Sequence, residues 1–171
     1  ATAFGIGSAF VYVASRNHAE RQTEAMTLIR DMDSIDQQLS QASREFGFAL
    51  KHFLESAEGT DPGALQHAHS TLIRSVDHSI GVVSRLQAPE SDHGAAFITE
   101  QRKFLLAQRH IIREDFGQLL KLLEDTSTPP PQASIQSIID SAYTETKTNF
   151  DTVHAIRVKF ASEFAIHLTT Q

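Results

Sequence analysis

Apolar residues recur at intervals of three and four along most of the chain, and this spacing constrains the fold more than any other feature. Such a spacing places side chains on one face of an α-helix, whereas a half-buried strand needs alternation of period two. β-branched alternation is absent, so the sequence predicts an all-α protein. The first series comprises Ala25, Leu28, Met32, Ile35, Leu39, Ala42, Phe46, Ala49 and Phe53.

Three stretches rich in proline, glycine and small polar residues divide the pattern into four segments. They read "EGTDPGA", "APESDHG" and "DTSTPPPQ". Asp61 can cap the second helix, and Pro62 suits its first turn because a missing N–H is tolerated there. The predicted helices lie near 8–57, 61–87, 91–124 and 131–169. The later apolar faces comprise Leu65, Leu72, Val76, Ile80 and Val83, then Phe97, Ile98, Phe104, Leu105, Ile111, Ile112, Leu119 and Leu122, and finally Ile135, Ile139, Ala142, Phe150, Val153, Phe160 and Phe164.

Four helices with one apolar face each, joined by short loops, predict an antiparallel up-down four-helix bundle with long first and fourth helices. An even number of helices returns the chain to its starting side. At about 1.5 Å per residue, the first and fourth helices, of roughly 50 and 40 residues, are expected to extend beyond the inner pair on that side.

The first 15 residues, "ATAFGIGSAFVYVAS", carry no charged side chain. A bilayer core needs about 20 apolar residues, so this stretch is too short to cross one. We interpret residues 1–14 as the outer end of a truncated transmembrane helix, and residues 15–171 as the soluble four-helix domain. The alternative is a buried N-terminal core helix.

Charge and composition exclude several classes of function. The formal net charge is −6 and no basic run occurs, so nucleic acid is a poor partner. Cysteine is absent, which removes disulfides, thiolate metal sites and thiol nucleophiles. The motifs of phosphate-binding glycine loops, serine hydrolases and zinc proteases are missing too. We therefore expect no catalysis.

The helix order, the helix lengths, the uncharged opening and the stretch "ASREFGFALKHFLESAEGTDPGALQHA" together resemble the four-helix-bundle sensor domains of bacterial chemoreceptors and sensor histidine kinases. The resemblance covers the whole chain but contains no diagnostic motif. It implies a domain facing the periplasm, anchored in the bacterial inner membrane by flanking helices and paired as a homodimer. It also implies that a small-molecule ligand or a periplasmic binding protein shifts one helix against another.

Two features depart from complete receptors of that family. We identify no cytoplasmic signalling module among these 171 residues, so the output is undefined. The last residues, "FAIHLTTQ", are too polar for a second transmembrane helix, which would follow Gln171.

Several polar residues occupy positions where the helical pattern predicts apolar ones. Gln101, Gln108 and Asp115, spaced seven apart, form one inward column on the third helix, and Thr146 and Arg157 interrupt the face of the fourth. Arg157 is expected to share a layer with Gln101, because the two are equally far from the intervening loop.

An inward guanidinium needs an anionic partner. We weigh capture of a small anion by Arg157, Gln101, Gln108 and Thr146 against an internal ion pair of Arg157 with Asp36. The inward column could equally form interhelical hydrogen bonds that fix register.

Other residues suggest two alternative sites. Arg30 and Arg44 lie on the predicted outward side of the first helix, together with Gln37, Gln41, Phe48 and His52, and could bind an anion across a homodimer seam. Nine histidines raise the possibility of a haem- or metal-binding bundle. His52 and His67 are predicted to project outward, and no E-x-x-H pair occurs, so we expect no cofactor and no metal. A non-catalytic structural interaction bundle is the remaining alternative.

Overall fold

The computed structural model describes residues 4–55, 62–124 and 132–168, with side chains described from Asn17 in the first range and from Gly63 in the second. These residues form helices and no strand, which confirms the all-α class. The elements are α1 (Phe4–Glu55), α2 (Pro62–Val83), α3 (Gly94–His110), the π-helical turn η1 (Ile111–Asp115), α4 (Phe116–Glu124) and α5 (Gln132–Glu163).

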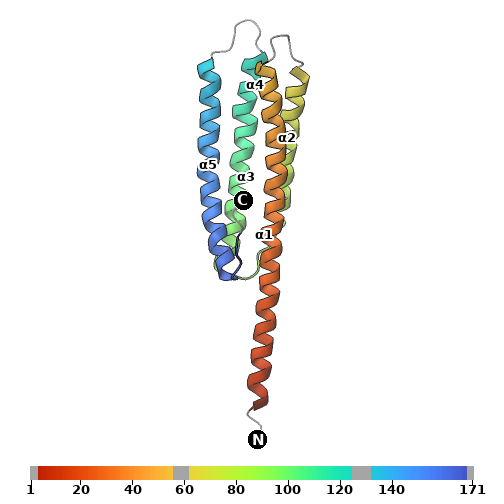
Figure 1. Cartoon of the computed structure of the whole chain (residues 1–171), viewed down its shortest axis with the longest axis vertical. Helices are drawn as coiled ribbons and strands as arrows, with labels where there is room; N and C mark the ends of the chain where they lie inside the picture. The colour runs from red at the N-terminus through yellow and green to blue at the C-terminus, as the bar shows by residue number, and fades with distance from the viewer. Residues whose placement is uncertain (1–3, 56–61, 125–131, 169–171) are drawn as a thin grey trace.

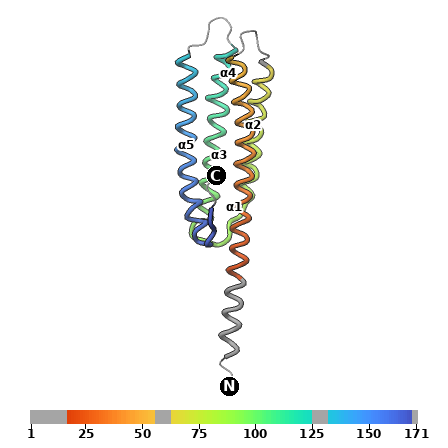
Figure 2. The backbone as a smooth tube through the Cα atoms, in the orientation of Figure 1, coloured from red at the N-terminus to blue at the C-terminus, as the bar shows by residue number. Residues whose placement is uncertain are grey.

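The helices lie side by side along one long axis, and α1 continues well beyond the others at its N-terminal end (Figure 1). α1 packs mainly against α2, and α5 mainly against α3, while α2 and α3 join the two pairs. Figure 2 shows the same arrangement as a backbone trace. The molecule is therefore built from two helix pairs that share one elongated core.

The predicted apolar faces form that core. Seven members of the first series, from Ala25 to Phe46, are buried on α1, whereas Ala49 and Phe53 are half-buried near its end. The largest fully buried side chains are Phe97, Phe160 and Met32. Phe97 stacks on Phe160 with their ring centroids 5.4 Å apart, which joins α3 to α5 in the centre of the core.

One member of the predicted fourth face is exposed, and Ile135 and Ile139 are half-buried. Phe150 is 51% exposed, so its assignment to the core was wrong. Its ring lies at the edge of the core instead, where it meets Phe104 edge-on and stacks on His154. These two ring contacts explain how the side chain is held without full burial.

The second helix ends earlier and the third helix begins later than the predicted positions 87 and 91. α2 ends at Val83, where the N–H groups of Arg85 and Leu86 bond to carbonyl oxygens three residues earlier and tighten the last turn. α3 begins at Gly94, whose N–H donates to Ser91 Oγ at 3.0 Å. The predicted helix ends at 57, 61 and 131, the Asp61 cap among them, lie outside the described residues.

The fourth helix ends earlier than predicted. α5 stops at Glu163 because Ala165 adopts a left-handed conformation with φ of 53°. The N–H of Ile166 donates to Ala161 O, and the N–H of Ala165 donates to Ser162 O, as in a Schellman motif. Ile166 then packs against the core. The expectation that the fourth helix runs to 169 and extends beyond the inner pair was therefore wrong. Among the described helices, α1 alone extends beyond its neighbours (Figure 1).

The third helical segment contains a feature that the sequence pattern did not predict. At η1 the N–H of Phe116 donates to the carbonyl of Ile111, five residues earlier, so the helix widens by one residue. A ring nitrogen of His69 on α2 lies 2.7 Å from the carbonyl oxygen of Ile112 and donates to it. This bond satisfies a carbonyl group in the widened turn.

Candidate functional site

Four polar side chains from three helices meet at the edge of the core, and we call this set the polar layer: Asp33 and Asp36 on α1, Gln101 on α3 and Arg157 on α5. Gln101 is only 1% exposed, and its Nε2 donates to Asp36 Oδ1 at 2.8 Å. Arg157 Nη2 lies 2.7 Å from Asp33 Oδ1. The prediction that Gln101 and Arg157 share a layer is therefore confirmed.

The ion-pair partner of Arg157 differs from the one we predicted. Arg157 pairs with Asp33 and not with Asp36, the partner expected from the sequence. Asp33 and Asp36 are three residues apart, so both face the same side of α1. The positive charge of Arg157 still acts on Asp36 and lowers the pKa of that carboxyl group. The guanidinium thus serves two carboxylates, one by direct contact and one through its field.

A small cavity adjoins the polar layer. Its volume is about 20 Å³, and it is lined by Asp36, Gln101, Phe104, Phe150, Val153, His154 and Arg157. A cavity needs about 10–15 Å³ on this measure to hold one water molecule. The cavity therefore has room for one water and not for a small-molecule carboxylate. Inside the layer, Arg157 Nε is buried and has no hydrogen-bond partner among the described residues.

Burial dominates the electrostatics of Asp36. Desolvation raises the pKa of this carboxyl group from 3.8 to about 6, against the lowering effects of the hydrogen bond from Gln101 and the charge of Arg157. The neighbouring Asp33 raises it a little further. Carboxyl groups whose pKa is raised by desolvation are common in functional sites.

Gln108 and Thr146, the other two predicted ligand-binding residues, lie apart from the cavity. Gln108 Nε2 donates to Thr146 Oγ1 at 3.0 Å, which joins α3 to α5 by a second polar contact. Each residue of the predicted set thus has a polar partner within the chain. Asp115, the last member of the predicted inward column, is half-buried within η1, where the π-turn alters the helical register.

The two arginines of the alternative anion site on α1 do not lie together. Arg30 and Arg44 are both exposed, as is Phe48, which is 72% exposed. Fourteen residues of helix separate the two arginines, or about 21 Å at 1.5 Å per residue. Within one chain they cannot hold the same small anion, although both are accessible to a partner molecule.

The histidines are dispersed. All nine are exposed except His69 and His93, which are half-buried. The predicted outward orientation of His52 and His67 is confirmed. Among the described residues, no group of three or more His, Asp or Glu side chains could hold a metal ion.

A second cluster of polar contacts lies near the end of α5. Glu163 pairs with His93 and also accepts the N–H of Asp92 at 3.0 Å. Gln22 on α1 donates from Nε2 to the carbonyl oxygen of Phe164 at 2.8 Å. These contacts fasten the end of α5 both to α1 and to the segment between α2 and α3.

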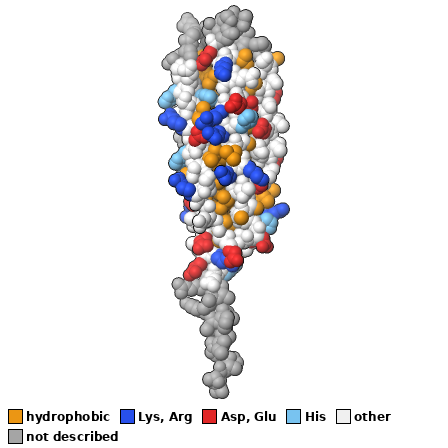
Figure 3. Space-filling model, turned by 180° about the vertical axis from the view of Figure 1, so that it is seen from behind, with side chains coloured by type: hydrophobic (Ala, Val, Ile, Leu, Met, Phe, Trp, Pro, Cys, Tyr) orange, Lys and Arg blue, Asp and Glu red, His pale blue; other side chains and the backbone are white. Residues whose placement is uncertain are grey.

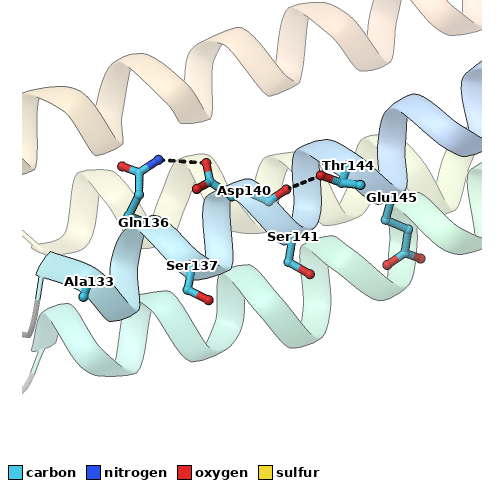
Figure 4. A pocket seen from close by; sticks show the side chains of 7 residues that line it. All are labelled: Ala133, Gln136, Ser137, Asp140, Ser141, Thr144 and Glu145. Carbon is cyan, nitrogen blue, oxygen red and sulfur yellow. Dashed lines mark hydrogen bonds between the residues drawn. The ribbon is translucent and has the colours of Figure 1, made fainter.

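An open depression runs along α5 from Ala133 to Glu145, where Gln136 donates to Asp140 (Figure 4). A single helix lines it, so a ligand there would lack a second wall. On the face seen from behind, apolar side chains are interspersed with basic and histidine side chains (Figure 3).

The N-terminal part of α1 bears on the membrane prediction only through its backbone. Residues 4–14 are helical, but their side chains, on which the prediction for residues 1–14 depends, lie outside the described part of the chain. Of the helices that the structure describes, none combines the length and apolar character that a bilayer span requires.

Comparison of the chain with protein-family models, with curated proteins and with solved structures finds no match. A proposal for function therefore depends on the geometry of the polar layer and on the resemblance in helix organisation.

The sequence pattern missed three residues at the site, namely Asp33, Phe150 as a cavity wall, and His154. Asp33 carried a usable signal, because it lies one turn before Asp36 at the edge of the apolar face. The positions of Phe150 and His154 depend on how α5 is rotated against α1, which the pattern of one helix does not specify.

Proposed function

We propose that this chain is the sensor module of a transmembrane signalling receptor of the chemoreceptor or histidine kinase type, folded as an antiparallel up-down four-helix bundle. In this proposal the module faces the periplasm, and α1 carries a displacement towards the inner membrane. The observation that carries the proposal is the way α1 is attached. α1 packs mainly on α2 but is joined by polar bridges to α5, through Asp33 and Arg157, and to the turn that follows α5, through Gln22 and Phe164 O.

Polar bridges of this kind can be exchanged at modest cost, whereas apolar packing resists sliding. A stimulus that alters them would let α1 shift relative to α3 and α5. Because α1 is one helix from Phe4 to Glu55, a shift at the polar layer would reach its protruding end. α5 is a poorer carrier of such a shift, since it ends at Glu163.

The proposed partners follow the resemblance. The exposed side of α1, with Arg30, Arg44 and Phe48, is the proposed homodimer seam. A small molecule or a periplasmic binding protein is the proposed stimulus, and it would act on the contacts made by Arg157, Gln101, Gln108 and Thr146. The cavity at the layer is too small for a small-molecule ligand, so such a ligand would have to separate the helices or bind elsewhere.

A hybrid receptor tests this function. The chain replaces the periplasmic domain of a chemoreceptor whose kinase output is measured, and cells are exposed to a panel of small molecules, periplasmic extract and buffers of different pH. We expect a stimulus-dependent change in kinase output that Asp33→Asn alters and that the exposed-surface control Asp140→Asn does not. An output that no stimulus changes, in a hybrid that reaches the membrane, would contradict the proposal.

The two alternatives have their own signatures in the purified protein. A Soret absorbance band or stoichiometric zinc would favour a haem- or metal-binding bundle. If both are lacking and the hybrid is silent, a structural interaction bundle becomes the better explanation.

A further inference from the structure

The polar layer has an unbalanced charge when all its carboxyl groups are ionised. Asp33 and Asp36 each carry one negative charge, Arg157 carries one positive charge, and Gln101 is neutral. The guanidinium is in direct contact with Asp33 and acts on Asp36 only through its field, so the direct contact of Asp36 is with the neutral amide of Gln101, at 2.8 Å. One negative charge is therefore left without a contacting cation inside the core.

The space beside Asp36 restricts what could neutralise that charge. The cavity of about 20 Å³ admits one water molecule. A metal ion would need several oxygen ligands, and the nearby guanidinium would repel it. A proton needs no room, so it is the species that fits the site.

The groups that face Asp36 come from three helices. On α1 the facing group is Asp33, on α3 it is the amide of Gln101, and on α5 they are Arg157 and His154, which lines the same cavity. α2 contributes no ionisable group to the cavity lining, and its Asp77 is engaged by Arg109 and Arg113 at 2.8 and 2.7 Å.

We propose that Asp36 is a proton-binding site whose occupancy sets how tightly α1 is held against α3 and α5. The raised pKa of Asp36, about 6, supports this assignment because it brings the titration into the range of environmental pH. The idea deepens the proposed sensor function by naming the proton as a stimulus, and its place in signalling rests on that function. Proton binding by Asp36 does not depend on that function.

The two protonation states differ in the contacts they favour. When Asp36 is ionised, it repels Asp33 one turn away and its charge is buried at a cost, so separation of α1 from α3 and α5 is favoured. When Asp36 takes a proton from solvent, the repulsion ends and Arg157 remains with Asp33. The new O–H can donate to Gln101 or to a water in the cavity. Acid therefore tightens the joint and alkali loosens it.

The sequence contains no cysteine, so spin labels attach only to cysteines that are introduced. Ser40→Cys on α1 and Thr152→Cys on α5, both at exposed positions, accept a pair of spin labels, and the distance between them is measured from pH 4.5 to 8 in the full chain. Helix shifts of this kind amount to about 1–2 Å. We expect a lengthening of that size with a midpoint near pH 6.

Two variants assign the midpoint to one group. In Asp36→Asn the pH-dependent lengthening should be lost, whereas the exposed-carboxylate control Asp151→Asn should retain it. His154→Gln removes the imidazole that lines the same cavity as Asp36. Loss of the transition in His154→Gln together with its retention in Asp36→Asn would overturn the proposal.

Carboxyl ¹³C NMR of the unsubstituted chain gives a result that does not depend on folding of a variant. An Asp36 carboxyl resonance that titrates near pH 6 supports the proposal, and one that titrates near pH 4 refutes it. The outcome is separable from that of the hybrid receptor. Titration of the isolated chain with a silent hybrid would refute the sensor function alone, whereas a responsive hybrid without titration would refute only the proton site.

Discussion

Arg157 Nη2 on α5 lies 2.7 Å from Asp33 Oδ1 on α1, and this ion pair bridges two helices that otherwise pack mainly on other partners. The arginine side chain is 21% exposed and the aspartate 38% exposed. The pair is thus neither a fully solvated surface contact nor a dry core contact. Its strength should lie above the median of surface pairs, because water screens it only in part.

A double-mutant cycle measures this pair. We expect Arg157→Ala and Asp33→Asn to show a coupling of about 1 kcal/mol in the free energy of unfolding, determined by urea denaturation. The matched cycle of Arg157→Ala with Asp36→Asn should show a smaller coupling, because Asp36 is not in contact with the guanidinium. A larger coupling to Asp36 than to Asp33 would contradict the observed pairing.

The pH dependence of stability should carry a signature of Asp36. Its pKa is raised on folding, from 3.8 to about 6, so the protonated form is favoured in the native state. The resulting stability is fully present below pH 3.8 and is lost as the pH rises through 6. The rise of the Asp36 pKa from 3.8 to about 6 corresponds to about 3 kcal/mol in the free energy of unfolding.

This loss is checked by urea denaturation of the wild type and Asp36→Asn at pH 4.5 and 7.5. The difference in the free energy of unfolding, Asp36→Asn minus wild type, should be more favourable to the variant at pH 7.5 than at pH 4.5. Asp151→Asn, on the exposed side of α5, should follow the wild-type profile. Identical profiles for wild type and Asp36→Asn would show that the carboxyl group is not desolvated as described.

The left-handed residue at the end of α5 offers a gain in stability. Ala165 has φ of 53°, a conformation that costs an L-residue with a Cβ about 1 kcal/mol and costs glycine little. Ala165→Gly should therefore raise the free energy of unfolding by about 0.5–1 kcal/mol.

Ala155→Gly is the matched control, because Ala155 is exposed in the interior of the same helix. There glycine should lower stability by about 1 kcal/mol. Equal losses for the two glycine variants, seen as parallel decreases in Tm, would argue against the turn at Ala165.

Gly94 at the start of α3 should not tolerate a larger residue. A Cβ at this position would lie 2.5 Å from Ser91 Oγ and 2.7 Å from Ala88 Cβ. Gly94→Ala is expected to cost about 1–3 kcal/mol, as overpacking does in other cores. At Gly47 on α1 a Cβ would meet no atom within 4 Å, so Gly47→Ala should stabilise the helix by up to about 1 kcal/mol. Thermal denaturation of both variants would show shifts of opposite sign, and a neutral Gly94→Ala would disprove the close contact.

The sequence pattern was most informative where burial follows helical periodicity. Most residues of the faces that begin with Ala25, Leu65 and Phe97 are buried, because each helix must cover one apolar stripe. The same reasoning placed Gln101 and Arg157 in one layer. It assigned the wrong partner to Arg157 because Asp33 and Asp36 lie one turn apart on the same face, and the reach of a long side chain selects between them.

Helix ends were less predictable for a physical reason. The end of α5 at Glu163 depends on the left-handed backbone of Ala165, which the sequence does not predict. It also depends on Gln22, whose amide donates to the carbonyl oxygen of Phe164, 142 positions later in the chain. The π-turn at η1 likewise has its Ile112 carbonyl bonded by His69 of another helix. Both features depend on contacts between segments that are distant in sequence.

The sequence by itself therefore determined the all-α class, the number of helical segments and most of the residues that fill the core, because these follow from the period of the apolar residues along each segment. Only the tertiary structure decided which carboxylate Arg157 contacts, how small the space beside Asp36 is, and where α5 ends. Those features depend on the rotation and height of one helix against another. Side-chain packing sets these to within a fraction of a turn, and no single helix encodes them.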